Sequence, residues 1–407
     1  MTSSRKLHHW LAHACAGVAA GAALGWGAWG GGRVPVLALA LPLLVAFSRS
    51  RLQAFCVAFG YALGVLRFAP SFIASWFDGN MAIGLAAVAA YALIAGLVWS
   101  CGWSGSSHLW VRQAAISGAW LLALAACIGV PGHPLIAAGF VLPGTGWAGA
   151  GIALGLPACA LLAAHKLASS RGLRGGALLA VLACLAIAGL ALFQPPPEGT
   201  VPGVHAQRTA WGALRGEQAA LLRMQWMGAA RQSPVPATVV WPESILGRYE
   251  PALYPVLEIE LLRESRREGR TQIIGMDIPL VGNRMLNAAV AFYPDGRTAT
   301  AVARQPAPLS LWKPWRSTET FIADWSARNM LDLGQGDRAA VIFCYEEYLP
   351  LLYLLNEARD DPTAYVALTN TWAAQSEGAA LIQTWHSLGM ARLFARPYLK
   401  AENRPSA

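Results

Sequence analysis

A single cysteine in the second half of the chain stands where a nucleophile would be exposed. Cys344 follows an apolar run, residues 339–343, which predicts a buried strand, and precedes residues 349–357, which predict a helix. At such a turn, the first backbone N–H groups of the helix can lower the pKa of a thiol and receive an oxyanion. Position alone, however, favours a small packing side chain that ends a strand.

A carboxylate ends another predicted strand earlier in the chain. Residues 237–241 are strand-like, and Pro242, which has no N–H, ends the ladder, so Glu243 stands at the carboxyl end beside Trp241. A carboxylate there can have a raised pKa and act as a general base, although a surface glutamate at a strand end has the same appearance. We expect Glu243 and Cys344 to lie on adjacent central strands, with side chains roughly 3–6 Å apart.

The segments that must position this pair alternate between strands and helices. This alternation indicates an α/β layered domain over residues 204–407. A stretch rich in Pro and Gly, residues 195–203, is the predicted linker to an N-terminal domain, residues 1–194. Strands are predicted at 204–209, 237–241, 272–276, 287–293, 298–302, 339–343 and 365–369, and helices at 211–230, 254–267, 349–357 and 378–394.

The composition is typical of a membrane protein. Hydrophobic residues make up 55% of the 407 residues and charged residues only 13%. Residues 1–195 hold ten Lys or Arg and a single acid, Asp78, which leaves 21 basic and 21 acidic residues for the remainder. The net charge of +9 therefore belongs to the N-terminal half, where it reports topology, and no nucleic-acid binding is expected.

The N-terminal domain is a series of apolar segments, and a helix needs roughly 20 residues to cross a bilayer. The first segment has no clear cleavage site, so it is not typical of a signal peptide. An all-α bundle of about seven helices is predicted, with spans at 10–29, 34–48, 53–75, 81–101, 110–130, 145–165 and 175–193.

Basic residues indicate the orientation of these spans. With the N-terminus inside, the outer loops carry Arg33, and Arg67 lies near an outer helix end. Seven spans then place residues 204–407 outside the cytoplasm, which is the periplasm for a multi-pass protein of a bacterial inner membrane. The inner loops carry Arg5, Lys6, Arg49, Arg51, Arg112, Lys166, Arg171 and Arg174.

The contexts of the two candidate residues resemble a known superfamily. Glu243 in VVWPES and Cys344 in VIFCYEE stand in the order seen in nitrilases (carbon–nitrogen hydrolases), which use a Glu-Lys-Cys triad at strand ends. The chain also resembles apolipoprotein N-acyltransferases, which share an N-terminal membrane bundle and segments like YVALTNTW and ARPYLKAEN. Shorter relatives, the conjugal transfer proteins of the TraB type, have this layout and a closer length. The resemblance implies an αββα sandwich without cofactor or metal.

Local motifs do not assign the lysine of that triad. The second half of the chain has two lysines, Lys313 and Lys400. Arg304 directly follows a predicted hairpin strand, where the family keeps its lysine, whereas Lys313 must reach the site from a loop rich in Pro and Trp. A lysine can hold an oxyanion and pass a proton, but an arginine cannot pass one. We therefore predict Lys313 as the catalytic cation and Arg304 as a substrate-binding alternative.

The resemblance also implies a reaction and its partners. Glu243 would deprotonate Cys344, and Tyr345 and Glu346, which match the family's residues after the nucleophile, would shape the substrate site. A membrane phospholipid would be the acyl donor, and a lipoprotein or another amine the acceptor. In the TraB type, conjugation-apparatus proteins would be partners.

Because the chain ends at Ala407, before the last strands and final membrane helix of the acyltransferases, we expect a truncated sandwich. Three functions stay open. The first is a TraB-type protein with cysteine-dependent acyl-transfer or amidase chemistry. The second is a true apolipoprotein N-acyltransferase. The third is a non-catalytic scaffold of a plasmid transfer apparatus.

Overall fold

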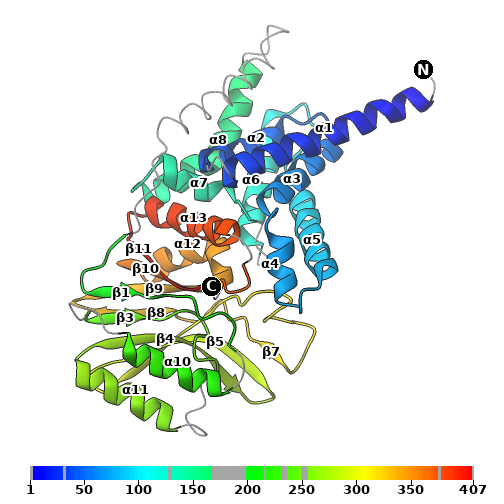
Figure 1. The fold of residues 1–407 in the computed structure, drawn as a ribbon. Helices are drawn as coiled ribbons and strands as arrows, with labels where there is room; N and C mark the ends of the chain where they lie inside the picture. The colour runs from blue at the N-terminus through cyan, green and yellow to red at the C-terminus, as the bar shows by residue number, and fades with distance from the viewer. Residues whose placement is uncertain are drawn as a thin grey trace. The chain divides into compact units, whose positions relative to one another are not determined.

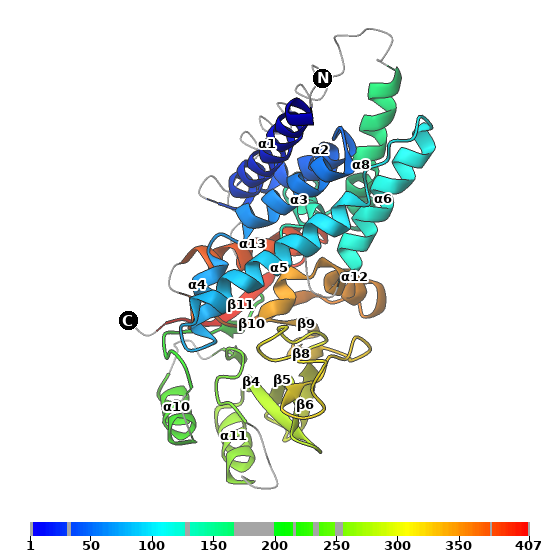
Figure 2. The same cartoon turned by 90° about the vertical axis from the view of Figure 1, so that its right-hand side faces the viewer.

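The computed structural model describes residues 3–30, 34–126, 131–166, 199–214, 217–230, 236–248, 255–374 and 377–405. By its internal contacts the chain divides into two compact units (Figures 1 and 2). The helical unit comprises Met1–Pro196, Tyr348–Leu351 and Leu381–Ala395, and the sandwich unit comprises Pro197–Glu347, Leu352–Ala380 and Arg396–Ala407.

Apolar helices make up the N-terminal part of the helical unit. Three of its described helices contain stretches long and apolar enough to cross a membrane, namely Leu11–Trp29, Met81–Ser100 and Gly146–His165. The described elements are α1 (Ser3–Trp29), the 3-10 helix η1 (Pro35–Leu39), α2 (Ala40–Ala46), α3 (Arg51–Val65), α4 (Ala69–Ser75), α5 (Met81–Ser100), α6 (Leu109–Ala125), α7 (Pro134–Val141) and α8 (Gly146–Lys166).

One predicted span is broken in the structure. The segment 53–75 forms α3 and α4, which are bent by 60° and give a fourth candidate span only if they cross together. The break precedes Pro70, which lacks the N–H that a continuous helix needs. The segments 34–48 and 110–130 contain shorter apolar helices, and the predicted span 175–193 lies outside the described residues.

Glycines let helices of this unit approach one another closely. A Cβ atom added at Gly21 of α1 would lie 1.9 Å from the carbonyl oxygen of Val57, and one at Gly60 of α3 would lie 2.1 Å from that of Val18. Small residues at such contacts are the usual way in which membrane helices pack. The α1–α3 contact therefore depends on both glycines.

The helix α13 (Glu377–Leu393) contributes its larger part to the helical unit. A Cβ atom at Gly139 of α7 would lie 1.7 Å from the carbonyl oxygen of Gly389. The backbone N–H of Gly132 donates a hydrogen bond of 2.7 Å to His386 Nε2. A segment that lies between two strands of the sandwich unit in sequence is thus packed into the helical unit.

The sandwich unit contains two β-sheets. Sheet A has the strand order β1-β3-β4-β5-β6, with β7 paired to β5, and sheet B has the order β2-β11-β10-β9-β8. The strands of sheet A are β1 (Val204–Ala206), β3 (Thr238–Val240), β4 (Thr271–Leu280), β5 (Arg284–Phe292), β6 (Thr298–Val302) and β7 (Thr320–Phe321). Those of sheet B are β2 (Arg208–Thr209), β8 (Met330–Gly334), β9 (Asp337–Phe343), β10 (Ala364–Asn370) and β11 (Tyr398–Asn403).

The two sheets face each other and carry helices outside (Figure 2). Their inner faces share one apolar core, to which sheet A contributes Val240 and Ile273, and sheet B contributes Val341 and Val366. The helices α10 (Glu217–Ala229) and α11 (Pro255–Glu268) cover the outer face of sheet A, and α12 (Pro350–Arg359) lies on sheet B. The predicted α/β layered domain is therefore present, with the layers of an αββα sandwich.

Several element boundaries differ from the sequence predictions. The predicted strand 204–209 is two strands in different sheets, because Gln207 donates its N–H to Val240 of sheet A and accepts with its carbonyl from Glu402 of sheet B. The helix predicted from residue 211 is assigned in the described part only from Glu217. The strands β7, β8 and β11 were not predicted, and β11 was hidden by charged residues such as Lys400.

Candidate active site

A close approach between two chain segments positions Glu243. Beyond β3, the N–H of Trp241 still donates a hydrogen bond to the carbonyl of Ile273 on β4. The chain then turns away from the sheet at Pro242. A Cβ atom at Gly275 of β4 would lie 2.3 Å from the carbonyl oxygen of Pro242 and 2.5 Å from the Cα atom of Glu243. Only glycine fits at position 275. The close contact with β4 therefore fixes the position of the Glu243 backbone, from which the carboxylate side chain extends.

Cys344 lies at the opposing sheet. It follows β9 directly and opens the 3-10 turn Cys344–Tyr348. The thiol is half-buried, and its Sγ lies 3.9 Å from the carbonyl oxygen of Asn370 at the end of β10. Cys344 therefore stands at the carboxyl edge of sheet B, where parallel strands end together.

Glu243 and Cys344 meet across the sandwich, and our prediction of adjacent strands is wrong. Glu243 follows β3 of sheet A, whereas Cys344 follows β9 of sheet B. Both strands end at the same edge of the sandwich, so their side chains converge from two layers. A hydrogen bond joins the Glu243 carboxyl group and the Cys344 thiol.

The Glu243 carboxyl group is tuned for proton transfer. Its residue is only 6% exposed, and burial raises its pKa to about 8. The charges of Asp277 and Glu346 also contribute to this raised pKa, whereas hydrogen bonds with Asn287 and Cys344 lower it. A carboxyl group with a pKa near neutrality is suited to accept and return a proton under ordinary conditions.

Asn287 is a site residue that the sequence analysis missed. It lies on β5, is 1% exposed, and donates a hydrogen bond from Nδ2 to Glu243 Oε1. Its neighbour across the ladder is Asp277, whose carboxyl accepts a 2.7 Å hydrogen bond from Ser244 Oγ and whose pKa is raised by burial to about 6. A polar amide within an otherwise apolar hairpin strand was the available signal.

Glu346 ties the nucleophile turn to sheet A. Its side chain is fully buried, and Oε1 accepts from the backbone N–H groups of Arg304 and Gln305, at 2.5 and 2.9 Å. Its Oε2 accepts from the N–H of Phe343 at 3.0 Å. Burial raises the pKa of Glu346 to about 7 against these bonds. Tyr345, half-buried, lies between Cys344 and this anchor.

Arg304 is buried, with its guanidinium bound to other parts of the sandwich unit. Its Nε donates to the carbonyl of Ala327 at 2.9 Å, and Nη1 donates to Asn356 Oδ1 of α12 at 2.5 Å. Its Nη2 lies 3.8 Å from Asp360 Oδ2. Only the backbone of Arg304 reaches the nucleophile turn, and none of these bonds brings the guanidinium to the Glu243–Cys344 pair.

Lys313 lies in the loop between β6 and β7. It is half-buried, and its backbone N–H donates to Thr320 Oγ1 at 2.8 Å. Within the part of the chain that the structure describes, its ammonium group makes no hydrogen bond and no ion pair. The structure therefore brings Glu243, Cys344 and Glu346 together, whereas the Lys313 ammonium group forms no hydrogen bond or ion pair with these three residues in the described part of the chain. Across the same described ranges, no group of His, Cys, Asp or Glu residues could hold a metal ion.

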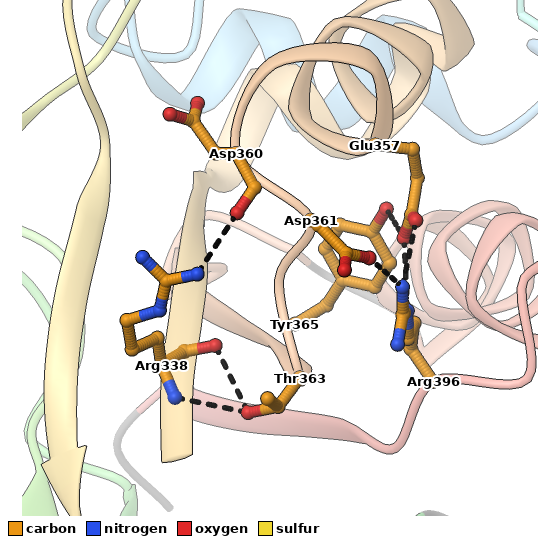
Figure 3. Close-up of polar contacts among 7 residues, drawn as sticks. All are labelled: Arg338, Glu357, Asp360, Asp361, Thr363, Tyr365 and Arg396. Atoms are coloured by element: carbon orange, nitrogen blue, oxygen red, sulfur yellow. Dashed lines mark hydrogen bonds and ion pairs between the residues drawn. The ribbon is translucent and has the colours of Figure 1, made fainter. Parts of the chain in front are cut away.

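A separate polar cluster occupies the amino edge of sheet B (Figure 3). Arg396 contacts Glu357 Oε1 and Oε2 at 3.2 and 3.1 Å and also pairs with Asp361. Arg338 donates its N–H to Thr363 Oγ1 at 2.9 Å. These residues lie at or before the amino ends of β9, β10 and β11, and Cys344 follows the other end of β9. Their bonds connect loops and α12.

Two curated proteins are similar to this sequence over most of its length. A probable conjugal transfer protein TraB from Sinorhizobium fredii is 26% identical over 393 residues, which cover 90% of this chain and 92% of that protein. A conjugal transfer protein TraB from Agrobacterium fabrum is 28% identical over 387 residues, covering 90% of this chain and 87% of that protein. No protein-family model matches the sequence.

Solved structures with some likeness include an amidase described as a member of the nitrilase superfamily and a carbon–nitrogen hydrolase. An amidase from Nesterenkonia sp. has a TM-score of 0.37 and 15% identity, and the match covers 49% of this chain and 74% of that one. A carbon–nitrogen hydrolase from Helicobacter pylori has a TM-score of 0.33 and 13% identity, with 49% and 72% covered.

Proposed function

We propose that this chain is a membrane-anchored, nitrilase-like protein of the conjugal transfer TraB type that performs cysteine-dependent acyl transfer or amide hydrolysis. One observation carries the chemical part of the proposal. A buried carboxyl group with a pKa near 8, Glu243, is hydrogen-bonded to the thiol of Cys344 at the start of a helical turn. The similarity to two TraB proteins over nine-tenths of the chain supports the biological part.

The reaction begins with proton transfer inside this pair. Glu243 takes the thiol proton, and the Cys344 sulfur attacks the carbonyl carbon of an ester or amide. The carbonyl becomes a tetrahedral oxyanion beside the backbone N–H groups of the nucleophile turn. When it collapses, the alcohol or amine leaves with the proton from Glu243, and a thioester on Cys344 remains. An amine or water, deprotonated by Glu243, then attacks the thioester and releases the thiol.

Lys313 stays our proposed cation for the oxyanion. Its ammonium group can move to the site without breaking a described hydrogen bond or ion pair. The Arg304 guanidinium, in contrast, would have to break its hydrogen bonds to Ala327 and Asn356. A movement of the loop between β6 and β7 would have to bring Lys313 to the site when substrate binds. Tyr345 is then proposed to border the substrate and Glu346 to hold the turn, whereas the buried Arg304 no longer fits the substrate-binding role predicted for it.

The membrane setting suggests the substrates. The three apolar helices, together with the predicted outward orientation, support a bilayer phospholipid as acyl donor and a lipoprotein or other amine as acceptor. We place the sandwich unit in the periplasm of a bacterial inner membrane. A reporter phosphatase fused at residue 200 should be active there, and a cytoplasmic reporter at the same residue should be silent.

A second function, a binding scaffold in the transfer apparatus, is favoured by one observation. Among the described residues, the Lys313 ammonium group makes no hydrogen bond or ion pair, although a positive side chain at the site would stabilise the oxyanion. A true apolipoprotein N-acyltransferase is the alternative within the catalytic class. Complementation of a strain that lacks its own N-acyltransferase separates this alternative from the TraB-type reading.

The decisive experiment is acylation of the full-length protein by a p-nitrophenyl ester in detergent micelles. We expect nitrophenolate release with a thioester at Cys344, none with Cys344→Ser, and a loss of about 100-fold with Lys313→Ala. Arg316→Ala is the matched control, because it removes a nearby positive charge of the same loop. A folded protein that shows no acylation at Cys344 would leave the scaffold function as the better account.

A further inference from the structure

The nucleophile turn carries a second buried glutamate, which the proposed mechanism does not use. Glu347 is 1% exposed, and three side chains engage its carboxylate. Thr369 Oγ1 and Tyr398 OH donate to its two oxygens at 2.7 and 2.6 Å. Lys400 Nζ lies 3.3 Å from its Oε1. This carboxylate is therefore bound on both oxygens and balanced by a cation.

Lys400 is the second lysine of the sandwich unit and received no role from the sequence. It lies on β11, level with Ala367 of β10, which is level with Ile342 of β9. Ile342 is two residues before Cys344, so the lysine stem starts two strands away from the nucleophile strand. The side chain of Lys400 is 1% exposed and that of Glu347 is fully buried.

A second carboxylate shares this cation. Burial tends to raise the pKa of Glu402, but the charge of Lys400 and bonds from Arg404 and Thr371 hold it below its ordinary value. Arg404 Nε lies 2.8 Å from Glu402 Oε2. The cluster thus contains two cations and two anions, and the loss of any one leaves a net charge near the carboxyl edge of sheet B.

Such a pair is costly to build for stability alone. Removing two charges from water costs several kcal/mol per ion, and apolar side chains of similar size often serve a fold equally well. The position of the pair gives it another use. The two consecutive glutamates hold the nucleophile turn from opposite sides, since Glu346 binds N–H groups beside sheet A and Glu347 binds side chains of sheet B.

We propose that Lys400 and Glu347 are positioning residues for Cys344, in which a buried ion pair fixes the nucleophile turn and keeps the local charge balanced beside the thiol. The inference rests on the proposed function, because it assigns the pair to that same site. Charge balance matters there because Glu243 and Glu346 already face the thiol region from the other side. Further charged groups among the described residues near this edge include Asp277 on β4, Glu402 on β11, Arg404 after it, and Arg208 on β2, which is level with Glu402.

The test measures how the reactivity of Cys344 depends on pH in the full-length protein in lipid nanodiscs. Iodoacetamide alkylates the protein between about pH 5 and pH 10, and mass spectrometry follows the peptide that contains Cys344. Lys400→Met leaves an unbalanced anion and should raise the midpoint by about one pH unit. Glu347→Gln leaves an unbalanced cation and should lower it by a similar amount.

Two further variants complete the design. Lys400→Arg keeps the charge and should keep the midpoint within a few tenths of a unit of the wild type, roughly the error of such titrations. The double variant Lys400→Met/Glu347→Gln removes both charges and should return the midpoint toward that of the wild type. If Lys400→Met fails to melt cooperatively, the downward shift expected for Glu347→Gln and the unchanged midpoint expected for Lys400→Arg still decide the question.

Two results would overturn the inference. Single variants that lower the melting temperature but leave the midpoint unchanged would make the pair purely structural. Shifts of the same sign in both single variants would exclude charge balance. Ester turnover is measured on the same samples, so a wild type without turnover would contradict the proposed function while the midpoints still test the role of Lys400 and Glu347.

Discussion

The two edges of sheet B use charge in opposite ways. At the amino edge, Arg396 and Asp361 are exposed by 26% and 81% of their side chains, and their ion pair lies at the surface. At the carboxyl edge, Glu346 and Glu347 are buried and bound by N–H groups, hydroxyls and Lys400. The same strands begin among solvated ion pairs and end among charges removed from water.

This difference separates what holds the fold from what can do chemistry. Solvated ion pairs contribute little to stability, typically up to about 1 kcal/mol. Buried carboxyl groups are shifted toward neutrality, as Glu243 and Glu346 are, and can exchange protons near pH 7. Variants at the two edges should therefore change different measurements.

The largest effect is expected from Glu243→Gln. The amide keeps the shape but cannot accept the thiol proton, so acylation of Cys344 should slow by roughly 10²–10⁴-fold. The matched control is Glu357→Gln, because Glu357 is also a buried glutamate, with a side chain 4% exposed, but lies at the amino edge. Equal losses in both variants would show that the two edges do not differ in function.

The second effect is on pH dependence. Acylation of Cys344 should rise with pH up to about pH 8, where Glu243 becomes ionised, and Glu243→Gln should remove this step. The free energy of unfolding should change in the opposite direction and fall as the pH rises. The folded pKa of Glu243 is raised, so its contribution to stability is fully present below the unfolded pKa, near 4.5, and is lost as pH rises through about 8. Thermal melts across this window measure that trend, and a flat acylation profile would contradict the assigned base.

Asn287→Ala should have a smaller and more specific effect. The hydrogen bond from Asn287 lowers the pKa of Glu243, so its loss should move the acylation midpoint upward. The rate on the high-pH plateau should fall less than in Glu243→Gln, because the base itself remains. A downward shift of the midpoint would mean that Asn287 does not stabilise the ionised carboxylate.

Arg396→Ala should give the smallest effect, and it tests the amino edge of sheet B. It removes a half-solvated ion pair, so the free energy of unfolding should fall by about 1 kcal/mol while the acylation rate stays unchanged. Arg396→Lys is the control, because it keeps the charge but loses the two-pronged contact with Glu357. A large loss of acylation would make the amino edge part of the functional site.

Much of the fold could be predicted from local sequence patterns. The strand before Cys344 and the hairpin strand β6 have clear apolar or alternating runs. Both are present, β6 with both expected ends and β9 with the expected carboxyl end. The strand β11 was missed because Lys400 and Glu402 alternate with apolar residues as on an exposed strand, although both are buried. The ion partner of Lys400, Glu347, lies far away in sequence, so only the folded chain shows why Lys400 can be buried.

The site was predicted only in part for a similar reason. Glu243 and Cys344 were found because each ends a strand within a distinctive motif. Their placement on two opposing sheets was missed, since strand pairing over about a hundred residues is not encoded locally. Asn287 was missed because its partner is a carboxylate on another strand. Lys313 and Arg304 show the limit most plainly, because order along a loop does not determine which way a long side chain turns.

The membership of residues 381–395 in the helical unit has a consequence for biogenesis. These residues are synthesised after the strands up to β10, yet the backbone of Gly389 packs against Gly139, which is made far earlier. The early helices must therefore wait, with that glycine contact empty, until the strands up to β10 have been synthesised. Completion of the helical unit therefore requires that most of the sandwich unit has been translated, and a chain that stops before residue 381 would lack the helix that packs against Gly139.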